Sequence, residues 1–296
     1  MRRQDALEQI VTKDTDFVVD VGGGHRPFWR ANLVVEKHPF ENSLHRNRPM
    51  QFPNVPVIKA DALSLPIPDQ GCDLIFASHI IEHLPDPAGF VRELKRCSKR
   101  VYLEFPSRAR EVLFAWSFHE WLVEADGPAL RFYRNDLPQM FGALFHTEWD
   151  ATLGAWSEVR HEHLNTSIYC RTDELSCEFP TMGATERVLS DSPQGAAKVN
   201  FATEIHRPVY SLRECAAVLA QSLLPSALYA ALTKSKEAAS QNKDLTPGIV
   251  NRLMCLQCRT PNLSKANSEI VCSCGARYGE DRGVYDFDVV PSLPAR

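Results

Sequence analysis

The chain has 296 residues, of which 44% are hydrophobic and 24% charged, with a formal net charge of −4 and a pI near 6.2. These values are ordinary for a folded globular protein. The chain lacks the excess of basic residues that nonspecific binding to nucleic acid requires. The N-terminus has no apolar signal-peptide core and no segment reaches the length of a membrane-spanning helix, so we expect a cytoplasmic protein without a membrane partner.

The first hundred residues alternate apolar runs with helical or irregular segments. A short helix is predicted over 3–11, and apolar residues at helical spacing predict another over 87–99. Runs rich in β-branched residues predict five strands, over 17–21, 33–36, 55–59, 72–78 and 100–105. This order predicts an α/β fold with a Rossmann-like, mostly parallel sheet, whose ligand lies beyond the carboxyl ends of the strands.

A glycine-rich turn, Gly22-Gly23-Gly24, follows the first predicted strand. Such a turn lets the backbone approach a ligand closely. Pro27 stands where a dinucleotide fingerprint needs glycine, which argues against NAD or FAD, and the lysine of a phosphate-binding P-loop is missing. The short span from Gly24 to Leu33 leaves little room for a full crossover helix, so we expect a brief turn beginning at Pro27.

Acidic residues stand at three successive strand ends: Asp20, Glu36 and Asp61. At the end of the second strand, Glu36 could accept both ribose hydroxyls of a nucleoside. After the third strand, Asp61 could accept the adenine amino group. Each alone could equally be a helix cap or a solvated turn. As an ordered set they predict an adenosine-containing cofactor without phosphates.

Residues 17–106 resemble the class I S-adenosylmethionine-dependent methyltransferases of the type 11 group. The resemblance rests on the glycine-rich strand end, Glu36, the segment ADALSLPIPDQGCDLIFASHIIEHL and a following helix with RELKR. It implies S-adenosylmethionine as cofactor. By this resemblance, Asp20, Gly22 and Gly24 contact the methionine part and Glu36 contacts the ribose. Asp61 and Ala62 contact the adenine, and His79 lines the methyl-transfer pocket. The chain departs from the pattern of this family at two places. Arg26 stands where the glycine-rich motif usually has its third glycine, and Ser98-Lys99-Arg100 replaces the proline-glycine-glycine sequence that usually leads into the fifth strand.

Methyl transfer needs a general base only if the acceptor arrives protonated. The candidate catalytic residues are His79, Glu104 and His119, while His83 could equally be structural. Glu104 lies in an otherwise apolar strand, where a carboxylate must be paired or functional to be tolerated.

Aromatic residues are dense from Phe114 to Trp156. We expect this segment to form an aromatic-rich insertion or lid over the acceptor pocket, with His119 and Trp121 reaching the strand ends. The alternative is that these aromatics form core beneath extra strands.

Nine cysteines are present, and four of them crowd the C-terminus as two close pairs separated by thirteen residues: Cys255, Cys258, Cys272 and Cys274. Paired cysteines at this spacing suit a structural, tetrahedral Zn²⁺ site, whereas disulfides are disfavoured in the cytosol. The segment resembles the small zinc-ribbon activator subunit of tRNA and release-factor methyltransferases, through the cysteine pairs, Tyr278 and Gly283. That resemblance implies a structural or acceptor-recognising ribbon fused to the chain.

These features predict three parts. A methyltransferase domain spans 1–233, with a core over 15–106 and the insertion and remaining elements over 107–233. A polar linker covers 234–250, and a zinc-ribbon-like domain covers 251–296.

We expect methyl transfer to a small-molecule, sugar or biosynthetic-intermediate acceptor. Two alternatives remain: modification of a peptide, protein or RNA, and a noncatalytic scaffold that keeps the fold. The acidic pI argues against a nucleic-acid partner, and the sequence leaves the oligomeric state open.

Overall fold

The computed structural model describes residues 7–8, 10–24, 27–41, 55–114, 116–138, 161–190 and 243–288. Within these ranges, no helix combines the length and apolar character needed to cross a membrane. The predicted helix over 3–11 lies mostly outside the described residues, although Leu7 is helical. The described helices and 3₁₀ turns are η2 (Ile81–His83), α2 (Pro87–Cys97), α3 (Arg108–Phe114), α6 (His161–Leu164), η3 (Thr172–Glu174), α7 (Ala184–Ser190) and α11 (Pro247–Val250).

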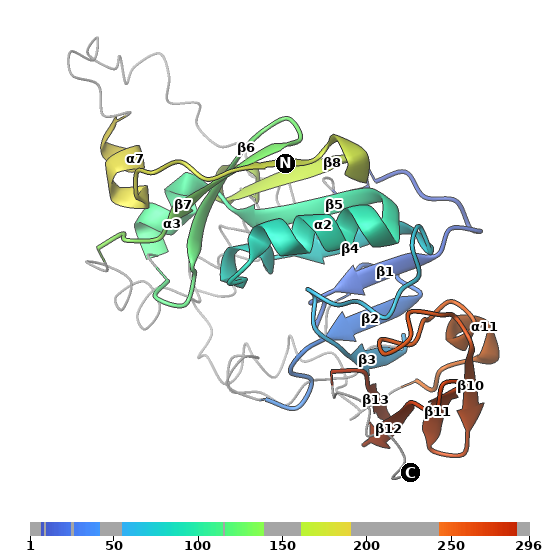
Figure 1. Cartoon of the computed structure of the whole chain (residues 1–296). Helices are drawn as coiled ribbons and strands as arrows, with labels where there is room; N and C mark the ends of the chain where they lie inside the picture. The colour runs from blue at the N-terminus through green and yellow to red at the C-terminus, as the bar shows by residue number, and fades with distance from the viewer. Residues whose placement is uncertain are drawn as a thin grey trace, which may run out of the picture.

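A central sheet organises the molecule (Figure 1). Its middle has the strand order β3-β2-β1-β4-β5, all parallel, and β8 pairs antiparallel with β5 at one side. The strands are β1 (Val18–Val21), β2 (Leu33–Glu36), β3 (Val57–Lys59), β4 (Cys72–Ser78), β5 (Ser98–Pro106) and β8 (Asn165–Arg171). The Rossmann-like, mostly parallel fold predicted from the sequence is confirmed.

The strand predictions agree with the structure to within one residue except at two strand starts. β3 begins after Pro56, which has no N–H to donate to a ladder. β5 is longer than expected and runs through Ser98-Lys99-Arg100. Residues 27–32 contain turns and no helix, as the short span after Gly24 indicated.

The two faces of the sheet bury different apolar residues because side chains alternate along a strand. On one face α2 packs its Phe90 and Leu94 against Val19 and Leu103. On the other face, the rings of Phe28, Phe76 and Tyr102 stack in a row, with centroids 4.9 and 4.8 Å apart.

Part of the aromatic segment forms a small second sheet, with the strand order β6-β7-β9. Trp121 and Phe132 pack into or against the main core there, which is the outcome expected if the aromatics were core. Phe118, in contrast, is 57% exposed. The rest of the predicted lid, from residue 139 to Trp156, lies outside the described residues. The strands are β6 (Trp121–Asp126), β7 (Ala129–Arg134) and β9 (Ser176–Glu178).

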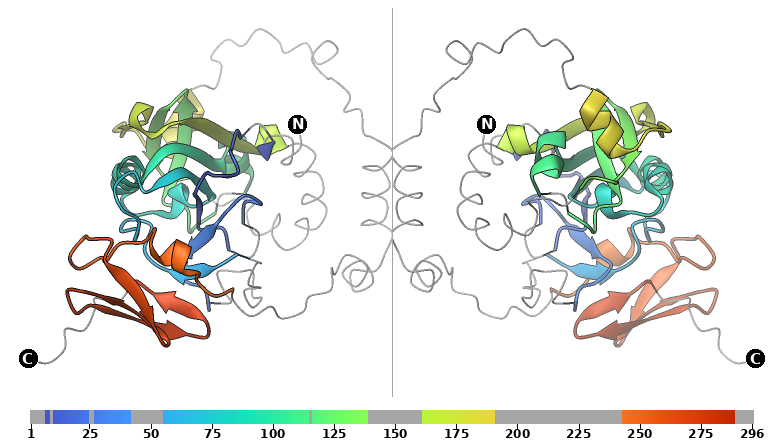
Figure 2. Two further views of the ribbon diagram at one scale, coloured as in Figure 1. Left: turned by 90° about the vertical axis from the view of Figure 1, so that its right-hand side faces the viewer. Right: turned by 90° about the vertical axis from the view of Figure 1, so that its left-hand side faces the viewer.

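The C-terminal module continues the main sheet (Figure 2). It consists of α11 and the strands β10 (Leu263–Ala266), β11 (Glu269–Cys272), β12 (Arg277–Asp281) and β13 (Val284–Asp286). β13 pairs in parallel with β3, so the module caps one edge of the sheet while β8 lies at the other.

The predicted linker over 234–250 differs from the structure in its last residues. Residues 234–242 lie outside the described part, but Leu245 and Val250 are buried. α11 begins behind Thr246, whose hydroxyl accepts a hydrogen bond from the Ile249 N–H. These residues therefore pack as part of the C-terminal module, because burial of two aliphatic side chains outweighs the polar composition of the segment.

Candidate functional site

The strand order reverses between β1 and β4, which is where parallel α/β sheets open a ligand crevice. The glycine turn follows β1 at this point. Gly22 has a φ of +73° and Gly24 a φ of +53°, conformations that glycine adopts without steric cost. A Cβ at Gly22 would lie 3.0 Å from Ile80 Cδ1, so the turn lies against the segment that follows β4.

Asp20 is fully buried beneath the glycine turn. Its Oδ2 accepts a 2.6 Å hydrogen bond from the Phe28 N–H, which fixes the far end of the turn. A Cβ at Gly23 would come within 2.7 Å of all three carboxyl atoms of Asp20. Asp20 therefore shapes the turn and requires glycine beside it.

Glu36 ends β2 at the same edge of the sheet and is partly exposed. Its Oε1 accepts a long, 3.4 Å hydrogen bond from the His38 N–H, and this is the hydrogen bond that its carboxylate makes with the described residues. A carboxylate so lightly engaged at a strand end can accept the two hydroxyls of a ribose.

Asp61 follows β3 and is already engaged. The Lys37 ammonium donates to its Oδ2 over 2.6 Å, and the Leu63 N–H donates to its Oδ1 over 2.8 Å. Burial opposes ionisation of Asp61, but these bonds outweigh it and lower its pKa. An adenine amino group would have to share this carboxylate with Lys37 or displace it. Ala62, beside it, is buried.

The donor and acceptor groups at this edge are of the kind that an adenosine-containing ligand without phosphates needs. The glycine turn has no room for side chains, and Glu36 offers acceptor oxygens one strand away. The turn does not supply the phosphate-binding lysine that a nucleotide with phosphates would use.

His79 lies directly after β4 with a φ of +56°, a left-handed conformation that side chains other than glycine adopt at some cost. Its Nδ1 is 3.1 Å from Glu82 Oε1, and the Arg110 guanidinium donates to its Nε2 over 3.2 Å. Because both ring nitrogens are engaged, the His79 ring is held in one orientation.

Glu104 is buried, and three side chains donate to it. Ser78 Oγ lies 2.8 Å from Oε1, while Tyr102 OH and His161 Nε2 each lie 2.8 Å from Oε2. These three hydrogen bonds explain how an apolar strand tolerates the Glu104 carboxylate, because each bond offsets part of the free-energy cost of its desolvation. The arrangement favours a positioning role for Glu104 over that of a proton acceptor.

His119 is buried beside a second carboxylate. Its Nδ1 lies 2.6 Å from Glu111 Oε1, and its ring packs edge-on against His83 with centroids 4.6 Å apart. Burial lowers the pKa of His83, so its imidazole is neutral near neutral pH. Glu82 lies between these histidines and His79. Burial alone would raise its pKa, but the hydrogen bond from His79 and the neighbouring histidines lower it.

The sequence analysis missed Arg110, His161 and Asn165. The Arg110 guanidinium joins His79 to Asn165 Oδ1, which is 2.5 Å away, and Asn165 in turn contacts His161 Nδ1 at 2.9 Å. The run His161-Glu162-His163-Leu164-Asn165 is the signal that could have drawn attention to them. Nothing local indicates that this run meets β5.

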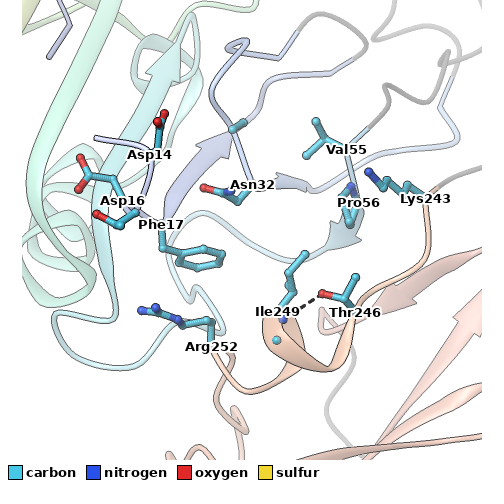
Figure 3. A pocket seen from close by; sticks show the side chains of 13 residues that line it. Asp14, Asp16, Phe17, Asn32, Val55, Pro56, Lys243, Thr246, Ile249 and Arg252 are labelled. Carbon is cyan, nitrogen blue, oxygen red and sulfur yellow. Dashed lines mark hydrogen bonds between the residues drawn. The ribbon is translucent and has the colours of Figure 1, made fainter. Parts of the chain in front are cut away.

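A cavity of about 450 Å³ lies at the opposite, amino end of the sheet (Figure 3). Asn32 and Phe17 face it from the sheet, and Ile249 and Arg252 face it from the C-terminal module. The Arg252 guanidinium lies 5.5 Å from the centre of the Phe17 ring. This cavity is separate from the strand ends that carry Gly22, Glu36 and Asp61.

The four C-terminal cysteines converge, with their sulfur atoms within 4.8 Å of one another. Cys255 Sγ lies 3.7 Å from Cys274 Sγ, and Cys258 Sγ lies 3.6 Å from Cys272 Sγ. Zn–S bonds of about 2.3 Å place tetrahedral sulfurs about 3.8 Å apart, whereas a disulfide needs about 2.05 Å. The Thr260 hydroxyl lowers the pKa of Cys258 to about 6, which favours the metal-binding thiolate. The residues therefore fit Zn²⁺.

In a comparison with known protein families, residues 30–101 match the family described as "Methyltransferase domain". Proteins from two Mycobacterium tuberculosis strains, each named "Probable S-adenosylmethionine-dependent methyltransferase", are 35% identical to this chain over 65 residues. The match covers 22% of this chain and 24% of each relative, so the chain spans about a quarter of the length of these curated relatives. The resemblance to class I methyltransferases predicted from the sequence is confirmed.

Solved structures of methyltransferases are distantly similar. One from Mesorhizobium loti is 18% identical with a TM-score of 0.34, covering 56% of this chain and 96% of that chain. One from Aquifex aeolicus is 16% identical with a TM-score of 0.32, covering 57% and 88%. A complex of the Haloferax volcanii Trm112 methyltransferase activator with a methyltransferase is 15% identical with a TM-score of 0.32, covering 46% and 72%.

Proposed function

We propose that this chain is a methyltransferase that binds S-adenosylmethionine at the carboxyl ends of β1, β2 and β3. The main support is the arrangement of residues where the strand order reverses. There the crowded glycine turn above buried Asp20 and the weakly hydrogen-bonded carboxylate of Glu36 lie at neighbouring strand ends. The match of residues 30–101 to a methyltransferase domain supports the same assignment.

In this proposal the backbone of Gly22 and Gly24 contacts the methionine part, Glu36 accepts the ribose hydroxyls, and Asp61 with Ala62 contacts the adenine. S-adenosylmethionine supplies an electrophilic methyl group when bound. The protein's task is then to orient the acceptor for in-line displacement and to exclude water. His79, held by Glu82 and Arg110, provides a fixed polar surface at the end of β4.

The acceptor in this proposal is a small polar molecule or biosynthetic intermediate. Supporting it, the polar groups beyond His79 form a compact cluster in which Arg110, Asn165 and His161 contact one another in series. Glu104 on β5 positions this cluster through its hydrogen bond with the His161 ring. A proton leaving the acceptor could pass to His79 only after the Arg110 bond to Nε2 opens, so the proposal assigns no obligatory general base.

We also propose that Cys255, Cys258, Cys272 and Cys274 hold one structural Zn²⁺. Sulfur spacings near the tetrahedral value support this. Four thiolates leave no open coordination position, so the ion would stabilise the C-terminal module and take no part in catalysis.

Titration calorimetry with S-adenosylmethionine tests the cofactor proposal without knowledge of the acceptor. Glu36→Ala should weaken binding by about 1–3 kcal/mol, because it leaves ribose hydroxyls unpaired. Glu178→Ala, at an exposed ion pair with Arg131, is the matched control and should bind like the wild type. Absence of heat with the wild-type chain would support a noncatalytic scaffold, and equal affinity in Glu36→Ala would remove Glu36 from the site.

A further inference from the structure

A second group of potential metal ligands lies beside the proposed acceptor side, away from the cysteines. Glu82, His83 and His119 each offer one ligand atom, and these atoms all lie within 4.8 Å of one another. Two of them come from η2, directly after Ile80, and the third from the segment before β6. We propose that Glu82, His83 and His119 bind a divalent transition-metal ion. The proposal does not depend on methyl transfer.

Both histidines are held with one ring nitrogen available. His119 Nδ1 lies 2.6 Å from Glu111 Oε1, and His83 Nδ1 lies 3.4 Å from the Phe118 carbonyl oxygen. A carboxylate and a carbonyl oxygen accept, so each Nδ1 is the donor of its bond, and the Nε2 atom of each ring is the one placed to face an ion. Metal-binding histidines are typically oriented in this way, by a carboxylate or a backbone carbonyl on the other ring nitrogen.

The carboxylates of this cluster are buried and incompletely satisfied. Glu82 and Glu111 are each 1% exposed, and in the described part of the chain neither Glu82 Oε2 nor Glu111 Oε2 has a hydrogen-bond partner. Every ion pair that these two carboxylates make with described residues is with a histidine. Buried carboxylate oxygens without a hydrogen-bond partner are costly, and a divalent cation bound at the cluster would offset that cost.

The donor set selects the kind of ion. Two imidazoles and one carboxylate suit Zn²⁺, Fe²⁺, Co²⁺ or Ni²⁺, whereas Mg²⁺ and Ca²⁺ prefer oxygen ligands alone. Zn–N bonds of about 2.0–2.1 Å place tetrahedral ligand atoms roughly 3.4 Å apart. Glu82 Oε1 and His83 Nε2 are 3.9 Å apart, so small side-chain rotations would close this pair around an ion. Three protein ligands leave a position open for water or for an oxygen atom of a bound acceptor.

Two hydrogen bonds, one backbone to backbone and one from a side chain to the backbone, hold the two parts of the cluster together. The Glu120 N–H donates to the Glu82 carbonyl over 2.8 Å, and the Trp121 indole N–H donates to the Leu84 carbonyl over 2.9 Å. Both donors directly follow His119 in the chain, so these bonds hold it beside η2. The ligands are therefore brought together by the fold before any ion binds.

Zinc content of the full-length chain tests the proposal. After equilibration with Zn²⁺ and removal of unbound metal, the wild type should hold about one ion per chain more than His83→Gln, by elemental analysis. This difference does not depend on how much zinc the cysteines hold. The His83 side chain is 35% exposed, so the substitution should leave the fold intact. Equal zinc content in the two proteins would overturn the proposal.

Two further variants separate binding from folding. Glu111→Gln keeps all three ligands but weakens the orientation of His119, and it should lower Zn²⁺ affinity 10- to 100-fold. His163→Gln, an exposed histidine outside the cluster, is the matched control and should keep the wild-type content. Wild-type affinity in Glu111→Gln would contradict the geometry proposed for His119.

Cobalt substitution gives a spectroscopic readout that separates the two sites. The full-length chain should bind a Co²⁺ equivalent whose absorption lacks the thiolate-to-cobalt charge transfer expected of the cysteine site. His83→Gln should lose that equivalent. If the wild type binds Co²⁺ only with thiolate charge transfer, the cluster is not a metal site.

Discussion

Tyr285 of the C-terminal module pairs in parallel register with Ile58 on β3, and both residues are buried. The next pair, Asp286 and Lys59, adds an ion pair of 2.9 Å between their side chains. The module thus completes an edge of the parallel sheet that would otherwise expose unpaired backbone groups. We call this pairing of β13 with β3 the seam. The proposed adenosine site at the end of β3 lies next to it.

Substitution at the seam should therefore destabilise the whole chain. Tyr285→Ala removes a buried ring and should lower the free energy of unfolding by about 3–5 kcal/mol, the range for large aromatic truncations. Tyr285→Phe keeps the ring and should cost less than about 1.5 kcal/mol. Urea unfolding followed by circular dichroism measures both. A separate early transition for the module, with the main transition unchanged, would contradict the shared core.

Removal of metal from the cysteines should act through the same seam. The wild-type chain should contain Zn²⁺ at the four cysteines, and Cys258→Ser should lower the zinc content by about one ion per chain. Because the module continues the main sheet, Cys258→Ser should also lower the melting temperature of the whole chain. Cys177→Ser, away from the cluster, is the control for loss of a thiol. A variant with unchanged zinc content would show that the cysteines do not hold the ion.

Lys37 and Asp61 offer a test of the adenine contact. Asp61→Ala should weaken S-adenosylmethionine binding by about 1–3 kcal/mol, because it removes the acceptor of the adenine amino group. Lys37→Ala removes a side chain that shares the same carboxylate and should leave affinity equal to or higher than that of the wild type. Calorimetric titration distinguishes the two. If Lys37→Ala binds as weakly as Asp61→Ala, the ion pair and not the carboxylate is needed.

Glu104 should behave as a structural residue. Glu104→Ala leaves the hydroxyls of Ser78 and Tyr102 and the His161 ring without their shared acceptor, at a cost of about 3–5 kcal/mol. Tyr102→Phe removes one of these bonds and should cost about 0.5–1.5 kcal/mol. Thermal unfolding is the measurement. A Glu104→Ala protein that unfolds like the wild type but has lost turnover would instead indicate a catalytic base.

Acid should destabilise the protein partly through Asp73. Burial opposes ionisation of this carboxyl, but hydrogen bonds from Lys99 Nζ and the Phe17 N–H outweigh it and lower its pKa. A carboxyl with a lowered pKa in the folded state stabilises the fold above its unfolded value near 3.9, and this contribution is lost as the pH falls through the folded pKa.

The corresponding variant is Asp73→Asn. It should lose about 1–3 kcal/mol at pH 7 and show a shallower loss of stability between about pH 5 and pH 2 than the wild type. Asp126→Asn, whose side chain is 76% exposed, is the control. Parallel stability curves for Asp73→Asn and the wild type would show that Asp73 does not contribute to the acid response.

The sequence determined the elements whose signal is local. β1, β2 and β4 follow from short apolar runs, and the glycine turn follows from three consecutive glycines. Convergence of Cys255, Cys258, Cys272 and Cys274 could be expected because each pair is presented by one tight turn. In these cases the residues that decide the structure are neighbours in the chain.

Tertiary structure alone decided the contacts that join distant segments. Lys59 meets Asp286 across 227 residues, and His161 reaches Glu104 across 57. His119 meets η2 because a backbone hydrogen bond from Glu120 to Glu82 joins the two segments. Such pairings depend on which sheet edges and strand ends the packed core leaves available, and no local pattern of apolar and polar residues records that choice.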